Sequence, residues 1–110
     1  MKLPYRNSAY IPREKLSEYL LSETHAIGRF KAKFFNTLGY NESNINLLEK
    51  LFLQIARSRK IKDKVKSSHG TKYILDGKLI SPSGKSVPIR TVWIIEPKQI
   101  RPRFVTAYPM

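Results

Sequence analysis

The sequence predicts an α+β domain with about three N-terminal helices packed on one face of a four-stranded antiparallel sheet. In the first half of the chain, apolar residues recur at helical spacing. In the second half, residues typical of strands lie between turn signals. Helices followed by strands, without alternation, favour this class. With 110 residues, of which 41% are hydrophobic, we expect one domain over 1–110, helical over about 12–59 and sheet over about 70–108.

The first and third expected helices have clear start signals. Pro12 suits a first helical turn, and the helix that follows over 13–21 has apolar side chains on one side. The third helix covers about 44–58, where the apolar residues mostly follow helical spacing. Asn41 or Ser43 is the candidate N-cap of this third helix.

The second expected helix runs over about 26–38. Thr24 is its candidate cap, and Gly39 is a good left-handed terminator. Counted at roughly 100° per residue from Ile27, Lys31 falls about 40° away, inside the apolar stripe. A lysine in that position either packs its stem on the rim of the core with its tip in water, or faces an opening where it can hold a phosphate.

The strands follow Gly70. A hairpin is expected from 71–75 and 78–80, joined by a two-residue turn at Asp76-Gly77. The other expected elements are a second turn over 81–84, a long strand over 87–95 that ends before Glu96-Pro97, and a short strand over 103–108.

The charge balance points to a polyanionic partner. The formal net charge is +13, and residues 57–110 contribute thirteen Lys and Arg against three acids. A basic half of this kind favours nucleic acid or an acidic protein, although a merely solvated basic surface is the alternative. No apolar run is long enough to span a membrane, so we expect no membrane anchor.

Composition excludes several kinds of chemistry. The chain has no cysteine and two histidines, His25 and His69, so we expect no metal site and no cofactor. The absence of cysteine fits a reducing compartment, and it also suits a chain that must refold after crossing membranes. We therefore expect a cytoplasmic site of action, in the producing cell or in a target cell if the protein is delivered.

Helix two brings together groups that suit phosphate chemistry. His25 lies at or before its first turn, where backbone N–H groups attract phosphate, and Arg29 and Lys31 follow within two turns. A surface histidine that caps the helix is the simpler interpretation. The functional interpretation makes His25 a general base or acid and the two cations a phosphate clamp.

The last two strands offer a second group. Alternation places Arg90 on one face of its strand and Thr91 with Trp93 on the other. In the final strand, Thr106 and Tyr108 are expected to share a face with Phe104. These side chains are common β-formers that could simply fill a sheet. Their hydroxyls could also bind a phosphate or assist a leaving group.

These residue types suffice for one reaction. Cleavage of RNA by attack of the 2′-hydroxyl on the adjacent phosphate needs a base, an acid and cations, and no metal. The eight acidic residues are scattered, so the pattern does not favour metal-dependent DNA cleavage.

The same residues carry a family resemblance. The matching blocks are Tyr10-Ile11, Lys15-Leu16, Tyr19-Leu20-Leu21-Ser22, His25-x-x-Gly28-Arg29-x-Lys31-Ala32-x-Phe34-Phe35-x-x-Leu38-Gly39, Gly70-Thr71-Lys72-Tyr73, Pro82-Ser83-Gly84, Arg90-Thr91-Val92-Trp93 and Pro102-Arg103-x-Val105-Thr106-Ala107-Tyr108-Pro109. They resemble a bacterial domain of unknown function, number 6883. That family looks like a toxin domain similar to the barnase, colicin and RelE-like ribonucleases. Ala26 departs from the expected proline, and His69 lies outside the pattern.

What the resemblance implies is a toxin of a toxin–antitoxin or toxin–immunity pair that acts as a metal-independent endoribonuclease and blocks translation or growth. It places five residues near the active cleft: His25, Arg29, Lys31, Thr91 and Thr106. The residues expected to bind substrate are Arg90, Arg103, Tyr108, Trp93, Lys72, Lys60 and Lys62. The expected partners are RNA and an acidic antitoxin or immunity protein.

Two other functions remain open at this point. The basic half, with aromatic residues for stacking, also suits a non-catalytic nucleic-acid-binding module. The third possibility is a domain that docks only an acidic protein. A membrane-surface role is the least favoured, because the basic stretch 57–66 has only Ile61 and Val65 as apolar residues, too few for an amphipathic anchor.

Overall fold

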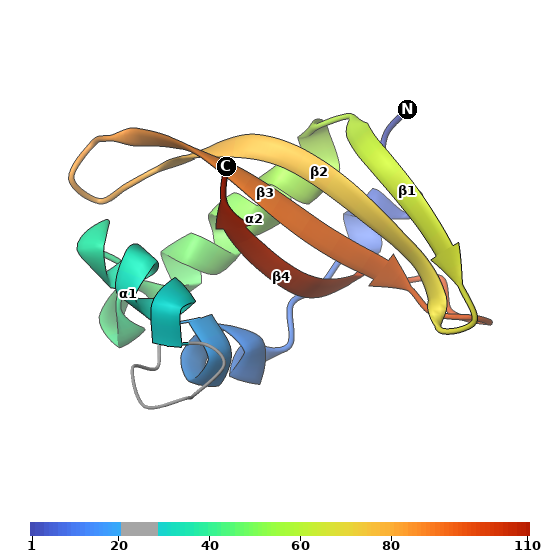
Figure 1. Ribbon diagram of the computed structural model, residues 1–110, viewed down its shortest axis with the longest axis horizontal. Helices are drawn as coiled ribbons and strands as arrows, with labels where there is room; N and C mark the ends of the chain where they lie inside the picture. Colours follow the sequence, from blue (N-terminus) through green and yellow to red (C-terminus); the bar gives the residue numbers. More distant parts are fainter. Residues whose placement is uncertain (21–28) are drawn as a thin grey trace.

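A computed structural model describes residues 1–20 and 29–110 (Figure 1). It contains a four-stranded antiparallel sheet in the order β1-β2-β3-β4. The strands are β1 (Ile61–Ser67), β2 (Gly70–Ile80), β3 (Ser86–Ile95) and β4 (Arg103–Pro109). The predicted α+β class with a four-stranded antiparallel sheet is confirmed.

The helical part precedes the sheet in the chain. Its elements are η1 (Arg6–Ser8), η2 (Lys15–Leu20), α1 (Arg29–Thr37), η3 (Glu42–Asn44) and α2 (Ile45–Ser58). The third predicted helix is confirmed as α2. The first is a π-helical segment, η2, and α1 covers the described part of the second. Gly39 ends the α1 region with φ of 102°, as predicted. Thr24 lies outside the described residues.

Neither predicted residue is the N-cap of the third helix, because the N-cap of α2 is Asn44. Asn41 forms a capping box with Asn44, and this box begins the short helix η3 that leads into α2. The Asn41 Oδ1 accepts a hydrogen bond of 2.8 Å from the Ser43 backbone N–H, so Ser43 is the capped residue and not the cap.

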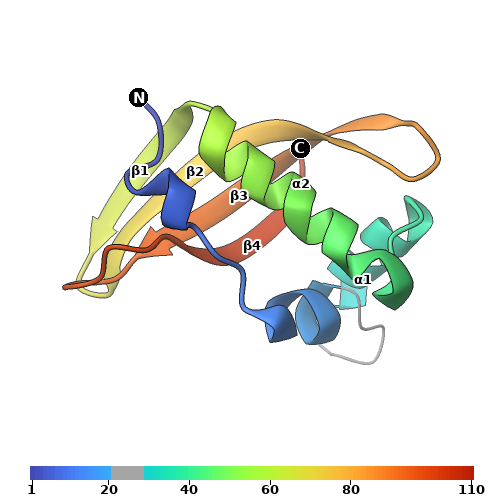
Figure 2. The ribbon, with the colours of Figure 1, turned by 180° about the vertical axis from the view of Figure 1, so that it is seen from behind.

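The core lies between α2 and the sheet (Figure 2). Phe52 of α2 stacks on Phe104 of β4, with ring centroids 5.1 Å apart. Trp93 of β3 meets Phe104 edge-on at 5.3 Å. All three side chains are fully buried. Only α2 among the longer described helices lies across the sheet, because α1 packs mainly against η2.

The predicted hairpin at Asp76-Gly77 is wrong. Both residues lie inside the continuous strand β2, paired with Arg90 and Ile89 of β3. The glycine serves packing instead of a turn. A Cβ atom at position 77 would come within 2.8 Å of the Ile55 side chain, so glycine lets α2 approach the sheet closely.

The strand that sequence reasoning missed is β1. It comes from the lysine-rich segment, pairs with β2, and is exposed along nearly all its length. Its alternation of charged residues carries no apolar signal because neither face of this edge strand is fully covered. The sheet therefore begins at Ile61, earlier than the expected 70, while the turn at 81–84 and the break at Pro97 are confirmed.

The N-terminal segment ties the two edges of the sheet to the rest of the domain. Lys2 forms a bridge with Lys60, just before β1, and Tyr10 forms a bridge with Arg103 at the start of β4. The Tyr10 carbonyl accepts a 3.0 Å hydrogen bond from the Phe104 N–H. This pairing places Tyr10 beside residues more than ninety positions away in sequence. Among the described residues, no helix is long and apolar enough to cross a membrane.

Candidate functional site

The face of the sheet that is turned away from α2 carries most of the predicted strand residues. We call it the outer face; Figure 1 is seen from this side and Figure 2 from the side of α2. Residues paired across antiparallel strands share a face. The pairing gives three rows on the outer face: Asp76–Arg90–Tyr108, Ile74–Val92–Thr106 and Lys72–Ile94–Arg103.

The middle of the outer face is apolar. Val92 and Ile94 are 9% and 5% exposed, yet they lie apart from the core cluster that α2 covers. Charged and hydroxyl-bearing residues stand at both ends of the first and third rows, and at the Thr106 end of the middle row. Because Val92 and Ile94 are nearly buried, the groups that this face offers a ligand are the cations and hydroxyls around them.

Arg90 is the central cation of this face. Its Nε donates to Asp76 Oδ1 at 2.7 Å and its Nη2 to Asp76 Oδ2 at 2.9 Å. The hydrogen bonds and charge of Asp76, with a smaller effect of Tyr108, raise the pKa of Arg90 above its ordinary value. The hydrogen bond from Arg90 lowers the pKa of Asp76. With its pKa raised, Arg90 stays charged. Asp76 takes two of the five guanidinium N–H donors of Arg90, so donors remain for another acceptor.

Tyr108 reaches the outer face through an irregularity in β4. Trp93 pairs with Phe104, but the preceding Val92 pairs with Thr106, so Val105 is an extra residue. Thr106 and Tyr108 therefore face away from Phe104, against the expectation. A bulge of this kind shifts the alternation by one residue, and the sequence pattern gives no signal of it.

Thr91 and Trp93 lie on the opposite face, as the alternation predicted, and both are fully buried there. The Thr91 hydroxyl donates to the Leu75 carbonyl at 2.8 Å and accepts from the Trp93 indole N–H at 2.9 Å. These bonds use the polar atoms of both side chains inside the sheet. The structure does not bring Thr91 and Trp93 together with Arg90, and we leave them out of the candidate site.

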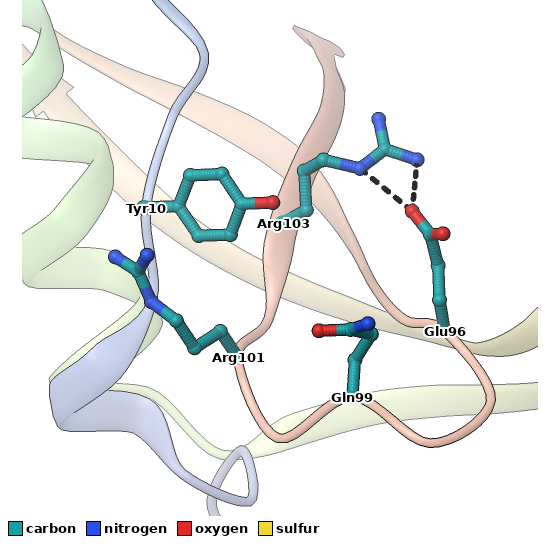
Figure 3. Close-up of a pocket in the computed structure, with 5 residues that line it drawn as sticks. All are labelled: Tyr10, Glu96, Gln99, Arg101 and Arg103. Atoms are coloured by element: carbon teal, nitrogen blue, oxygen red, sulfur yellow. Dashed lines mark hydrogen bonds and ion pairs between the residues drawn. The ribbon is translucent and has the colours of Figure 1, made fainter.

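A polar pocket lies at the start of β4 (Figure 3). It has a volume of about 280 Å³ and is lined by Tyr10, Glu96, Gln99, Arg101 and Arg103. Arg103 donates to Glu96 Oε1 from both Nε, at 2.9 Å, and Nη2, at 2.7 Å. Arg103 also belongs to the third row of the outer face, so the pocket and that row share this residue.

The residues predicted on helix two are placed only in part. His25 lies outside the described residues. Arg29 and Lys31 lie in the first turns of α1, but their side chains are also outside the described part. The chain just after α1 is fixed beside the β2–β3 turn, because the Tyr40 hydroxyl donates to the Ile80 carbonyl at 2.8 Å. The row that contains Arg90 is the one nearest to that end of the sheet.

The predicted lysines have separate positions. Lys60 and Lys62 are exposed at the start of β1, and the charge of Lys62 contributes to the low pKa of Asp76. Lys72 is exposed on the outer face, in the row of Arg103. Within residues 1–20 and 29–110, no group of three or more His, Cys, Asp or Glu residues is placed to hold a metal ion.

Several residues of the candidate site were not predicted from the sequence. Asp76 was assigned to a turn, and Tyr10, Glu96, Gln99 and Arg101 belong to loops and to a distant segment. The pairing of Asp76 with Arg90 could have been found from opposite charges at facing positions, had β2 been predicted as one strand. Nothing in the sequence indicated that Tyr10 lies beside β4.

Comparison with known proteins agrees with this fold. Residues 2–110 match the family described as Domain of unknown function (DUF6883), so the chain belongs to that family. No curated protein matches the chain. Among solved structures, it is similar to a chain of a contact-dependent growth inhibition toxin–immunity protein complex from Klebsiella pneumoniae 342. The two chains are 20% identical, each is covered over 96% of its length, and the TM-score is 0.73.

Proposed function

We propose that this domain is the toxic part of a toxin–immunity or toxin–antitoxin pair, and that it cleaves RNA without a metal ion. The observation that carries the proposal is Arg90, a permanently charged guanidinium held on the outer face beside Tyr108. The shared fold with a chain of a toxin–immunity complex supports the toxin role. A basic surface supports both RNA and an acidic immunity protein as partners. The site of action would be the cytoplasm, where RNA is found.

The proposed reaction is attack of a ribose 2′-hydroxyl on the neighbouring phosphorus, which expels the 5′-oxygen of the next nucleotide. Arg90 would neutralise the negative charge that grows on the phosphoryl oxygens. Tyr108, its neighbour in the row, would donate a hydrogen bond to the same phosphate. We keep Thr106 as a residue that orients the phosphate, from the next row of the outer face.

Proton transfer requires groups beyond these. We propose His25 as the base that removes the 2′-hydroxyl proton, or as the acid that protonates the leaving oxygen. We propose Arg29 and Lys31 of α1 as further cations that would bind the phosphate. This arrangement divides the work between the helical part and the outer face.

The test is digestion of total cellular RNA in the presence of EDTA. We expect cleavage by the wild type and a loss of at least about 100-fold in Arg90→Gln and His25→Ala, because a charge stabiliser or an acid–base group contributes that much. Lys50→Ala is the matched control. It removes one positive charge from the exposed side of α2, on the other side of the sheet, and should cleave like the wild type.

Each outcome has a clear meaning. Cleavage that survives in Arg90→Gln, with the fold intact by circular dichroism, would reject Arg90 as the phosphate-binding residue. Cleavage that EDTA abolishes would reject the metal-free reaction. Binding of RNA without any cleavage would favour the second candidate function.

That second candidate is a non-catalytic nucleic-acid-binding module, and the edge strand β1 favours it. The three lysines of this strand and the one just before it are exposed, and together they form a lysine edge: Lys60, Lys62, Lys64 and Lys66. In a pure binder, neutralising the lysine edge should weaken RNA affinity far more than Arg90→Gln does. In the ribonuclease, the same substitutions should reduce affinity and leave the cleavage of bound RNA.

A further inference from the structure

We propose that the pocket at the start of β4 binds an unpaired nucleobase of the RNA, and so sets the sequence preference of cleavage. This inference rests on the proposed function. The pocket differs from the Arg90 row in kind, since it combines an aromatic ring, an amide and a carboxylate with its cations. The Arg90 row offers donors for phosphate, and the pocket offers groups that can read the edge of a base.

One wall of the pocket is a stacked pair. The Arg101 guanidinium lies 4.2 Å from the centre of the Tyr10 ring, and its Nε donates to the Ser8 carbonyl at 3.1 Å. The stacking and the hydrogen bond together fix the Arg101 side chain. Planar groups such as a tyrosine ring and a guanidinium are the surfaces on which unpaired bases stack.

The other side supplies hydrogen-bonding groups. Figure 3 shows the Gln99 amide directed toward the space between Tyr10 and Glu96. An amide offers both donors and acceptors. Arg103 holds Glu96 through Oε1 alone, which leaves Oε2 as an acceptor for the N–H or amino group of a base. The pocket volume of about 280 Å³ accommodates a group as large as a purine.

The pocket lies where an RNA strand on the outer face would reach it. Arg90 and Ile94 are four residues apart on β3, and Ile94 pairs with Arg103. At about 3.3 Å per residue, the row of Arg103 lies roughly 13 Å from the row of Arg90 along the strand. Lys72, in the same row as Arg103, is exposed on β2 and can contact a phosphate of a strand that crosses this row.

Measuring the binding of single nucleotides, in which no RNA is cleaved, tests this proposal. The probes are the four nucleoside 5′-monophosphates and ribose 5-phosphate, which keeps the sugar and phosphate but lacks the base. The readout is the NMR signals of the Gln99 amide and of the Arg101 and Arg103 Nε–H groups. We expect at least one nucleotide to shift these signals at millimolar concentration and ribose 5-phosphate to leave them in place.

Variants then assign the contact. Gln99→Ala should weaken the binding of the favoured nucleotide by about 3- to 10-fold, because the variant loses one hydrogen bond. Lys98→Ala is the matched control, because it removes a charge from the neighbouring exposed residue and leaves the pocket lining unchanged. Its affinity should stay within about twofold of the wild type.

Three results would overturn the proposal. If ribose 5-phosphate shifts the signals as strongly as the nucleotides do, the pocket is a phosphate site. Lys98→Ala could weaken binding as much as Gln99→Ala, which would mean that charge alone attracts the nucleotides. If no nucleotide shifts the signals, the pocket serves another ligand, such as a protein segment. Because none of these readouts involves cleavage, the pocket can fail while the ribonuclease stands, and the reverse.

Discussion

The two faces of strand β3 differ: one is packed in the core, and the other carries the candidate site. On the face toward α2, Thr91 and Trp93 are fully buried and hydrogen-bonded to their own sheet. On the outer face, Arg90 is held by Asp76, but both side chains stay partly exposed, at 30% and 22%. Buried side chains that make their hydrogen bonds inside the sheet, such as Thr91 and Trp93, stabilise the fold. A partly exposed side chain such as Arg90 keeps donors that a ligand can use. Alternation along one strand thus separates stability from the candidate site.

The largest effect should come from the face toward α2. Phe52→Ala removes a fully buried ring that stacks on Phe104, so we expect a loss of about 3–5 kcal/mol in the free energy of unfolding. Urea denaturation, monitored by circular dichroism, measures this loss. Val65→Ala on the exposed strand β1 is the comparison and should change stability by less than about 0.5 kcal/mol. Similar losses of unfolding free energy in both variants would contradict the view that stability comes from the core between α2 and the sheet and not from the exposed strand β1.

A smaller effect is expected from Thr91→Val, which keeps the shape of the side chain. The change removes the acceptor of the Trp93 indole N–H in a fully buried place, and we expect a cost of about 1–3 kcal/mol. RNA cleavage by the folded variant should match that of the wild type. A variant that is equally stable but inactive would return Thr91 to the site that the sequence predicted.

How far the sequence could predict the fold depends on what each residue reports. The apolar spacing of α2 and the β-branched run of β3 reflect burial, and both elements were found. Burial is also why β1 was missed, since its residues are exposed and its pairing with β2 leaves no apolar pattern. The Asp76-Gly77 pair led to a wrong prediction because glycine is typical both of turns and of close packing contacts. The packing partner of Gly77, Ile55, lies 22 positions away in sequence.

The candidate site was predictable to a lesser degree. Arg90 and Tyr108 could be proposed from their types, but their meeting in one row depends on the bulge at Val105. The pocket depends on the bridge between Tyr10 and Arg103, a long-range pairing that local sequence does not report. His25 stays a prediction, because it lies outside the described residues.

The smallest expected effect concerns the outer face and depends on pH. Asp76→Asn keeps an oxygen beside Arg90 but removes the charge, and at neutral pH it should cost at most about 1 kcal/mol, because the pair is partly exposed. The folded pKa of Asp76 is lowered below its ordinary value of 3.8, so the carboxylate stabilises the fold above that value. The difference between wild type and variant should therefore shrink as the pH falls below 3.8. Urea titrations at pH 7 and at pH 3 measure it, and a difference that grows on acidification would show that Arg90 does not hold the Asp76 carboxylate in its charged form.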